Sequence, residues 1–301
     1  MFVIKYKNFF IGLSLFFVVL ALGAVVYFGL KPSIDFAGGV IVEVSYVEDR
    51  PEVQELEKDF SLLNLGSFSL RPSGENAFTL RTRTLSEAER EDVLSVFSEN
   101  STGEIVVERF NNIGPSIGEE LSRKAYLALG MVVLLIVVFI AFSFRHVSRP
   151  VSSWKYGLVA VIALIHDIII PTGVFAVLGF YLGYEIDTLF VTALLAIFGY
   201  SVSDTIVVFD RIRENLKKKE EYRGKESFGD TVGVSLSETM ARSFNTSFTT
   251  FLALLALYIF GPVSTEHFAL TLLVGVIAGT YSSIFLASPL LVLIERWQKK
   301  V

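Results

Sequence analysis

The sequence predicts an α-helical polytopic membrane protein with six transmembrane helices and a small α+β domain inserted between the first two. Of its 301 residues, 52% are hydrophobic, and the mean hydropathy of +0.57 is more than one soluble core can bury. The apolar residues fall in six blocks, each near the ~20 residues that a helix needs to cross a bilayer. Open strands would leave unpaired backbone groups in lipid, so helices are the predicted spans.

The predicted elements follow one another closely along the chain. They are the N-terminus and first span at 1–30, the external domain at 31–122, and a five-helix bundle at 123–301 with spans at about 123–144, 154–182, 187–209, 240–260 and 267–294. Residues 210–239 are predicted to be a cytoplasmic loop, for which surface helices and a solvated loop both remain open. The first block leads into Lys31-Pro32 and not into a cleavage site, so we expect it to stay as an anchor.

Lysine and arginine set the predicted orientation. They gather before the first span, between spans two and three, after span four and at the C-terminus. The alternate short loops carry only the acids Glu185, Asp187 and Glu266. Short loops rich in Lys and Arg stay in the cytoplasm, so both termini are predicted to be cytoplasmic and the inserted domain external.

The inserted domain alternates strand and helix patterns in the order βαββαβ, which predicts a ferredoxin-like fold. Residues 39–47 alternate apolar and polar side chains, Pro51 opens the first helix, and Ser86 is a predicted N-cap of the second. The domain has no histidine and no glycine-rich phosphate loop, which favours binding or structural work over catalysis.

Composition excludes several classes of function. The chain has no cysteine, which excludes disulfides and thiolate metal sites, and its net charge of −5 gives no indication of nucleic-acid binding. No metal site, no cofactor and no enzymatic activity are predicted.

Two ionisable residues, Asp204 and Arg242, lie at matched depth in predicted spans four and five. Helix rise places Asp204 ~8 Å inside the cytoplasmic edge, where a charge costs roughly 2.5–3.5 kcal/mol. If the two form an ion pair, protonation of Asp204 would free Arg242 and make a two-state switch. A static ion pair that only fixes packing, or an Arg242 that reaches the lipid headgroups, is the alternative.

His166 and Asp167 lie midway along the third span, one turn before Pro171, which frees a backbone carbonyl. They are candidate members of an ion relay, and a buried hydrogen-bonded packing pair is the alternative. Helix rise puts Asp167 ~20 Å from the cytoplasmic side, much deeper than Asp204. That difference argues against an intramembrane hydrolase with paired aspartates.

Small residues recur every fourth position in the sixth span, at Gly275, Gly279, Ser283 and Ala287. Such a stripe lets another helix approach closely. It predicts either a contact within the bundle or a subunit interface.

Residues 199–215, GYSVSDTIVVFDRIREN, closely resemble the signature of the SecF members of the SecD/SecF family of protein-export membrane proteins. The run includes Gly199, Asp204, Asp210 and Arg211. Three further stretches agree with the family: IDFAGG with Asp35, Gly38 and Gly39, GPSIG with Gly114 and Pro115, and LIHD with His166 and Asp167. The resemblance covers nearly the whole chain.

The resemblance implies an RND-like fold and a complex with SecD beside the SecYEG channel in the lipids of the cytoplasmic membrane. It implies a role in pulling exported, unfolded polypeptide outward with a proton or sodium gradient. By position, Asp204 corresponds to the family's coupling carboxylate and Arg242 to its partner, with Ser203 where the family usually has Asn. The alternative function is an RND-type exporter of lipids or small molecules, which would often carry a second external domain and set of spans.

Overall fold

The computed structural model describes residues 2–48, 50–66, 68–101, 103–143, 151–222 and 226–298. The chain divides into two compact units, Met1–Lys31 with Leu127–Val301, and Pro32–Tyr126. In the described ranges, six helical segments are long and apolar enough to cross a membrane. The predicted fold class, a six-span bundle with an inserted α+β domain, is confirmed.

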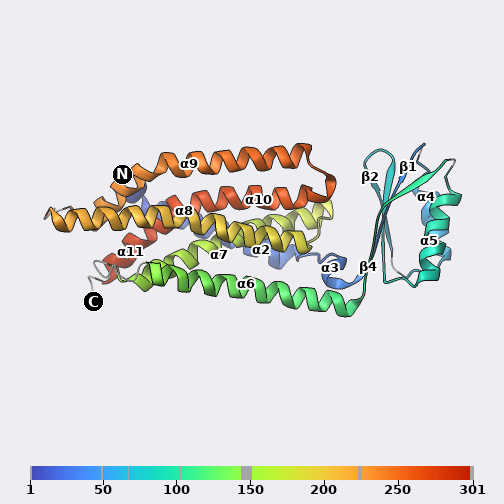
Figure 1. Ribbon diagram of the computed structural model, residues 1–301, viewed down its shortest axis with the longest axis horizontal. Coiled ribbons are helices and arrows are strands. Elements are labelled where there is room, and N and C mark those ends of the chain that lie inside the picture. Colours follow the sequence, from blue (N-terminus) through green and yellow to red (C-terminus); the bar gives the residue numbers. More distant parts are fainter. Residues whose placement is uncertain are drawn as a thin grey trace. The chain divides into compact units, whose positions relative to one another are not determined.

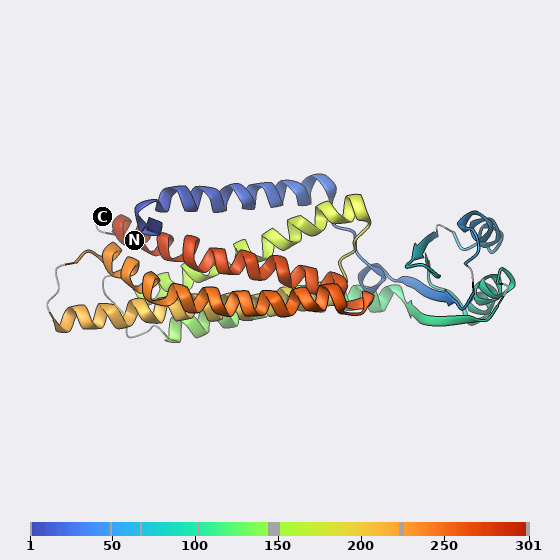
Figure 2. The ribbon, with the colours of Figure 1, turned by 90° about the horizontal axis from the view of Figure 1, so that it is seen from above.

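The membrane unit consists of long helices. They are α1 (Phe2–Lys5), α2 (Lys7–Phe28), α6 (Pro115–Ser143), α7 (Ser153–Leu182), α8 (Thr188–Glu221), α9 (Phe228–Phe260), α10 (Val263–Tyr281), the π-helix η1 (Ser282–Ala287) and α11 (Ser288–Gln298). The sixth span therefore consists of α10, η1 and α11 together. α2 packs along α7 (Figure 2), and α10 packs against α8 and α9 (Figure 1).

The inserted unit, which is the predicted external domain, is a four-stranded antiparallel sheet with two helices on one face (Figure 1). Its elements are α3 (Ile34–Ala37), β1 (Gly39–Tyr46), α4 (Val53–Leu62), β2 (Ser69–Ser73), β3 (Ala77–Thr82), α5 (Glu87–Glu99) and β4 (Ile105–Ile113). The strand order β2-β3-β1-β4 is that of the predicted βαββαβ fold, with β3 between β1 and β2. Alternate β1 residues such as Val40 and Val42 are fully buried with Phe60 of α4 and Phe97 of α5.

Of the two alternatives for residues 210–239, the structure has helices and not a solvated loop, because α8 continues to Glu221 and α9 begins at Phe228. Ion pairs one turn apart, such as Arg211–Glu214 and Glu214–Lys218, support the extension of α8. A capping box formed by Ser227 and Asp230 starts α9. The span predicted at 240–260 is thus the later part of a longer helix.

The helix that contains the second predicted span begins before that span, with Pro115 in the first position of α6. Its first turn packs closely against the segment that contains Gly38. A Cβ atom on Gly38, whose φ is +75°, would lie 3.0 Å from the Cα of Pro115, and one on Gly118 would lie 2.9 Å from the Phe36 carbonyl oxygen. Only glycine fits both positions, so the two glycine-containing motifs of the sequence meet here.

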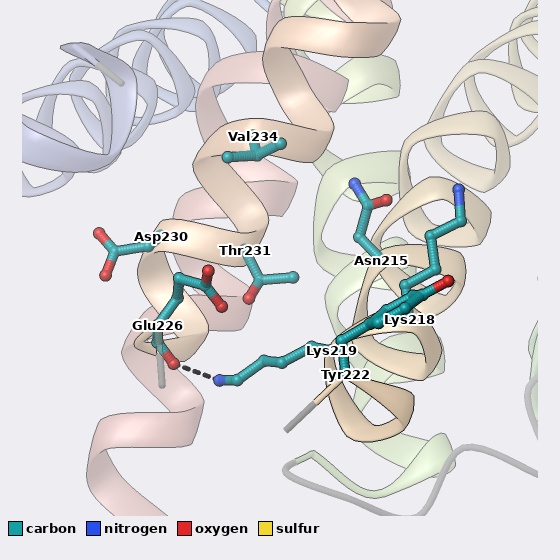
Figure 3. A pocket seen from close by; sticks show the side chains of 8 residues that line it. All are labelled: Asn215, Lys218, Lys219, Tyr222, Glu226, Asp230, Thr231 and Val234. Atoms are coloured by element: carbon teal, nitrogen blue, oxygen red, sulfur yellow. Dashed lines mark hydrogen bonds between the residues drawn. The ribbon is translucent and has the colours of Figure 1, made fainter. Parts of the chain in front are cut away.

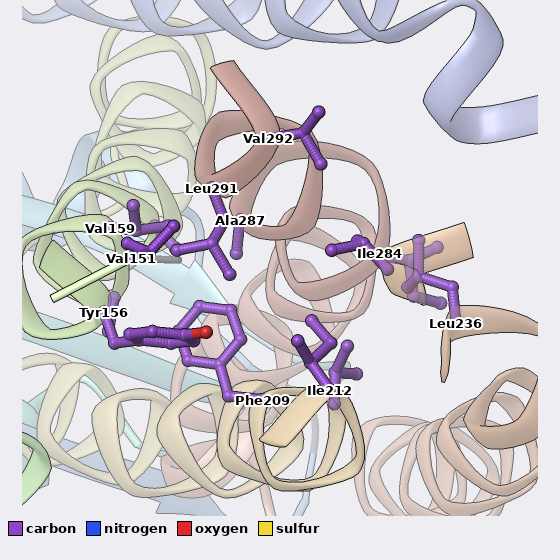
Figure 4. Close-up of a cluster of buried hydrophobic side chains, with 14 of the residues drawn as sticks. Val151, Tyr156, Val159, Phe209, Ile212, Leu236, Ile284, Ala287, Leu291 and Val292 are labelled. Atoms are coloured by element: carbon purple, nitrogen blue, oxygen red, sulfur yellow. The ribbon is translucent and has the colours of Figure 1, made fainter. Parts of the chain in front are cut away.

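One buried apolar cluster of the membrane unit joins side chains of α7, α8, α9, η1 and α11 (Figure 4). The rings of Tyr156 on α7 and Phe209 on α8 meet edge to face with centroids 5.3 Å apart. Ile212, Leu236 and Leu291 are fully buried in the same cluster. This packing joins the extended parts of α8 and α9 to α11.

Candidate functional site in the membrane unit

Helices α8 and α9 bring Asp204 and Arg242 to one cavity of about 110 Å³. Six residues line it: Tyr200, Ser203, Asp204, Val207, Arg242 and Thr246. The volume exceeds the ~10–15 Å³ that one water molecule needs, so the cavity has room for water beside the carboxylate. In the part of the chain that the structure describes, no ion pair joins Asp204 to Arg242; they share a cavity instead.

The carboxylate of Asp204 is incompletely satisfied. Among the described residues, its Oδ2 atom and the Oγ atom of Ser243 are buried without a hydrogen bond of good geometry, although the hydroxyl groups of Ser243 and Ser283 lie close enough to interact with the carboxylate. A buried polar atom without a partner costs roughly 1–3 kcal/mol. A water molecule in the cavity or another hydrogen-bond donor would satisfy this oxygen atom.

The cavity lies on a polar face of the bundle. Eight exposed residues of α8 and α9 form this face, all small or polar: Thr192, Ala196, Gly199, Ser203, Arg242, Asn245, Thr246 and Thr249. Polar groups at membrane depth normally face protein or water, because hydrocarbon offers them no partners. We call these eight residues the polar face.

Asp167 is completely buried and sits in a network of hydroxyl groups. Its Oδ1 atom lies 2.9 Å from Nδ1 of His166. Its Oδ2 atom accepts hydrogen bonds from Ser201 of α8 and from Ser282, the latter at 2.8 Å. The sequence suggested either an ion relay or a buried hydrogen-bonded pair, and the geometry contains the pair together with two serines that the sequence did not identify.

The depth difference predicted between Asp167 and Asp204 is wrong. Asp167 bonds to Ser201, which precedes Asp204 by three residues, or about 4.5 Å along the helix axis. Both depths were predicted by helix rise from assumed ends of the spans. Helix α8 runs far beyond its predicted end, so that reference point was not an end of the helix. Depth therefore does not argue against a paired-aspartate hydrolase. The partners of Asp167 do, because both of its oxygens are occupied by His166, Ser201 and Ser282.

The small-residue stripe of the sixth span is a contact within the bundle, against α8. A Cβ atom on Gly275 would lie 2.2 Å from the Cδ1 atom of Ile197, and one on Gly279 would lie 3.3 Å from the Cβ of Ser201. Further along, Ser283 hydrogen-bonds Thr205 at 3.0 Å. The close approach of α10 places the hydroxyl groups around Asp167.

The π-helix η1 in this span was not predicted. Pro289 follows it, and a proline in a helix lacks an N–H group and clashes with the carbonyl four residues earlier. A wider turn before Pro289 relieves that clash, so Ser288-Pro289 was the signal in the sequence.

Asp210 and Arg211 lie at the other end of the signature run and stabilise the extended hairpin of α8 and α9. Asp210 pairs with Arg213, and the Nε atom of Arg211 lies 2.7 Å from Glu238 on α9. Beyond them lies a second cavity, of about 280 Å³, between the two helices (Figure 3). Lys219 crosses it to the backbone carbonyl of Glu226. Asp210 and Arg211 thus have structural partners in this chain.

The remaining motif residues have conformational roles in the structure. Ser33 caps α3 by accepting a hydrogen bond from the backbone N–H of Asp35, and Gly39 has a φ of +136°. These positions, with Gly38, Gly114 and Pro115, shape the connection between α3, β1 and α6. In the described ranges, no group of three or more His, Cys, Asp or Glu side chains is arranged to hold a metal ion.

Comparison with known proteins agrees with the sequence resemblance. Residues 93–297 match the family model described as protein export membrane protein SecD/SecF, C-terminal. The protein translocase subunit SecF of Thermobaculum terrenum is 38% identical over 99% of this chain and 94% of its own length. SecF of Helicobacter pylori strain J99 is 31% identical over 94% of this chain and 84% of its own length.

Among solved structures, SecDF from Thermus thermophilus, described as a translocon-associated membrane protein, superposes with a TM-score of 0.82 at 30% identity. The match covers 98% of this chain but only 38% of that one. SecDF in its super-membrane-facing form matches with a TM-score of 0.68. A family model over most of the chain and SecF relatives of the same length lead to one conclusion: the chain belongs to the SecF family of protein translocase subunits.

Proposed function

We propose that this SecF-family subunit uses a proton or sodium gradient to drive late steps of polypeptide export across the cytoplasmic membrane. The observation that carries the proposal is the cavity that Asp204 and Arg242 share at the surface of the bundle. A carboxylate without a full set of partners, a nearby cation and space for water are what an ion-coupling site requires.

In the proposed cycle, a proton from outside reaches Asp204 through the cavity and cancels its charge. The electrostatic attraction between Asp204 and Arg242 then weakens, and the packing of α8 against α9 changes. The change would reach the external domain, which would hold or release the emerging chain. Each charge that crosses 100 mV supplies roughly 2.3 kcal/mol.

The polar face supports a protein partner in the membrane, and we propose that this partner is SecD. Lipid cannot satisfy Arg242 and Asn245, whereas helices that carry polar groups can. SecD would complete the ion site, and the pair would act beside SecYEG on unfolded polypeptide. With both termini cytoplasmic, the external domain would meet the client on the far side.

The relatives named above are translocase subunits, which favours protein export over the transport of lipids or small molecules. The geometry around Asp167 and Asp204 does not favour a hydrolase.

The test is gradient-dependent export in membrane vesicles that contain the variant Asp204→Asn. We expect export in response to the gradient to fall at least tenfold, because the side-chain amide of asparagine cannot gain or lose a proton near neutral pH. Glu220→Gln makes the same change at an exposed position of the same helix and should export normally. Undiminished export by Asp204→Asn would contradict the coupling role.

A further inference from the structure

Asp167 lies outside the cavity of Asp204, yet it is the more deeply buried of the two carboxyl groups. In the described residues, its only ion-pair partner is His166, and its other partners are the hydroxyl groups of Ser201 and Ser282. Hydroxyl donors suit an ionised carboxylate. Once protonated, the group has only one oxygen without a proton and becomes a donor itself.

Ser282 has a second acceptor already in place. Its hydroxyl group lies 3.1 Å from the carbonyl oxygen of Gly279, which also accepts from Ser283 at 2.9 Å. Loss of the bond to Asp167 would therefore leave Ser282 satisfied within its own helix. The cost of switching between the two arrangements is small for the hydroxyl group, because neither arrangement leaves it without a partner.

Ser282 is also the first residue of η1, the irregular turn in the sixth span. Its hydrogen bond to Asp167 attaches the start of η1 to α7, and Pro289 limits regular helix formation at the other end. Ser288 bonds the Ser283 carbonyl oxygen at 3.3 Å across the wider turn. π-turns of this kind are points where helices bend.

We propose that Asp167 is a second proton-binding site and that its protonation releases Ser282, so that α11 moves about the hinge formed by η1. The proton binds the Oδ2 atom of Asp167, which accepts from both serines; once protonated, Oδ2 keeps only one of these donors, and Ser282 transfers its hydrogen bond to the Gly279 carbonyl oxygen. This inference rests on the proposed function for the source of the proton. It adds a mechanical output that is separate from Asp204.

Three other titratable groups lie near Asp167: His166, Tyr281 and Asp204. His166 contacts Asp167 directly, and Tyr281 of α10 stacks on His166 with ring centroids 6.1 Å apart. Tyr281 is held by the Phe10 carbonyl oxygen of α2 at 3.1 Å. Asp204 of α8 is close enough to interact electrostatically with Asp167. A test must separate Asp167 from His166 and Asp204.

The experiment measures the hinge directly in the full chain in lipid nanodiscs. Because the protein has no native cysteine, spin labels can be placed at Trp154→Cys on α7, the helix that carries Asp167, and at Trp297→Cys on α11, both exposed. We expect the distance between the labels to shift when the pH is lowered. Asp167→Asn should show the low-pH distance at every pH, with complete loss of the shift.

Ser282→Ala separates the proton site from the hinge. It should also lose the shift, while the infrared band of a protonated buried carboxyl group still appears on acidification and disappears in Asp167→Asn. Asp204→Asn should keep the shift. A shift that persists in Asp167→Asn, or that disappears only in His166→Gln or only in Asp204→Asn, would overturn the proposal.

Export is not used as a readout, so the two proposals fail separately. Normal export by Asp204→Asn would contradict the proposed function and leave the hinge result unchanged. An immobile hinge together with defective export by Asp204→Asn would contradict only the role of Asp167.

Discussion

At the scale of single residues, the buried hydroxyl groups decide what each carboxylate can do. Asp204 and Asp167 belong to neighbouring helices and differ by about one turn in depth. Asp167 has polar partners at both oxygens, whereas Asp204 faces a cavity, with one buried oxygen atom that lacks a hydrogen bond of good geometry in the described residues. The two groups therefore differ in access to water and in their partners.

Glu89 in the external domain leads to a prediction about pH. Hydrogen bonds from Arg83 and from Ser86 lower the pKa of Glu89 from 4.5 to about 2. Because the folded pKa lies below the unfolded one, the stabilisation is complete above about 4.5 and is lost as the pH falls toward about 2. Hydrogen exchange of α5 should therefore be faster in Glu89→Gln than in the wild type at pH 7.

The difference in hydrogen-exchange rate between Glu89→Gln and the wild type should shrink as the pH falls from about 4.5 toward about 2. The two proteins are compared at the same pH each time. Glu91→Gln alters an exposed acid on the same helix and serves as the control. A difference that stays constant from pH 7 to pH 3 would show that the Glu89 charge does not stabilise α5.

At the scale of elements, the seam between α8 and α10 is the contact that builds the site. Gly275 and Gly279 let the sixth span approach closely enough for Ser282 and Ser283 to reach Asp167 and Thr205. The same seam leaves no space for a larger side chain at Gly275.

Gly275→Ala should destabilise the bundle by about 1–3 kcal/mol, the usual cost of overpacking. The new methyl group would overlap the end of the Ile197 side chain. The double variant with Ile197→Ala should be more stable than the sum of the two single changes predicts, because the overlap is gone. Thermal unfolding in detergent measures this.

Gly199→Ala is the matched control, since no atom lies within 4 Å of the added methyl group. Additive effects of Gly275→Ala and Ile197→Ala would mean that the two residues do not pack as the structure places them.

At the scale of the whole molecule, the polar face is the part of the membrane unit that remains incomplete. The helices α2 and α6 expose large apolar side chains such as Leu20 and Val138, which suit lipid. The eight residues of the polar face do not, although Phe244 and Phe248 on another side of α9 are exposed and apolar. This contrast in side-chain chemistry is the basis for proposing a protein partner at the polar face.

Cysteine cross-linking tests the partner of the polar face. With no native cysteine in the chain, Ser203→Cys or Asn245→Cys should cross-link to SecD in native membranes with a short bifunctional reagent. Val138→Cys, exposed on α6, should not. Equal cross-linking at all three positions, or none at Ser203 and Asn245, would contradict the proposed interface.

The sequence by itself determined the six spans, the βαββαβ order of the external domain and the candidates Asp204, Arg242 and Asp167. Hydrophobic blocks, alternating patterns and rare intramembrane charges are local signals, and each follows from the cost of placing a residue type in water or lipid. The ends of α8 and α9 could not be predicted in this way, because the polar parts of helices that continue beyond the apolar blocks have no hydropathy signal.

Only the tertiary structure decided which groups meet. It placed Ser201 and Ser282 on Asp167, turned the glycine stripe toward α8 and brought an exposed Arg242 to the cavity of Asp204, with no ion pair between the two among the described residues. Those contacts depend on the rotation and spacing of helices distant in the chain. Packing of α10 against α8 sets both, and no single segment carries that information.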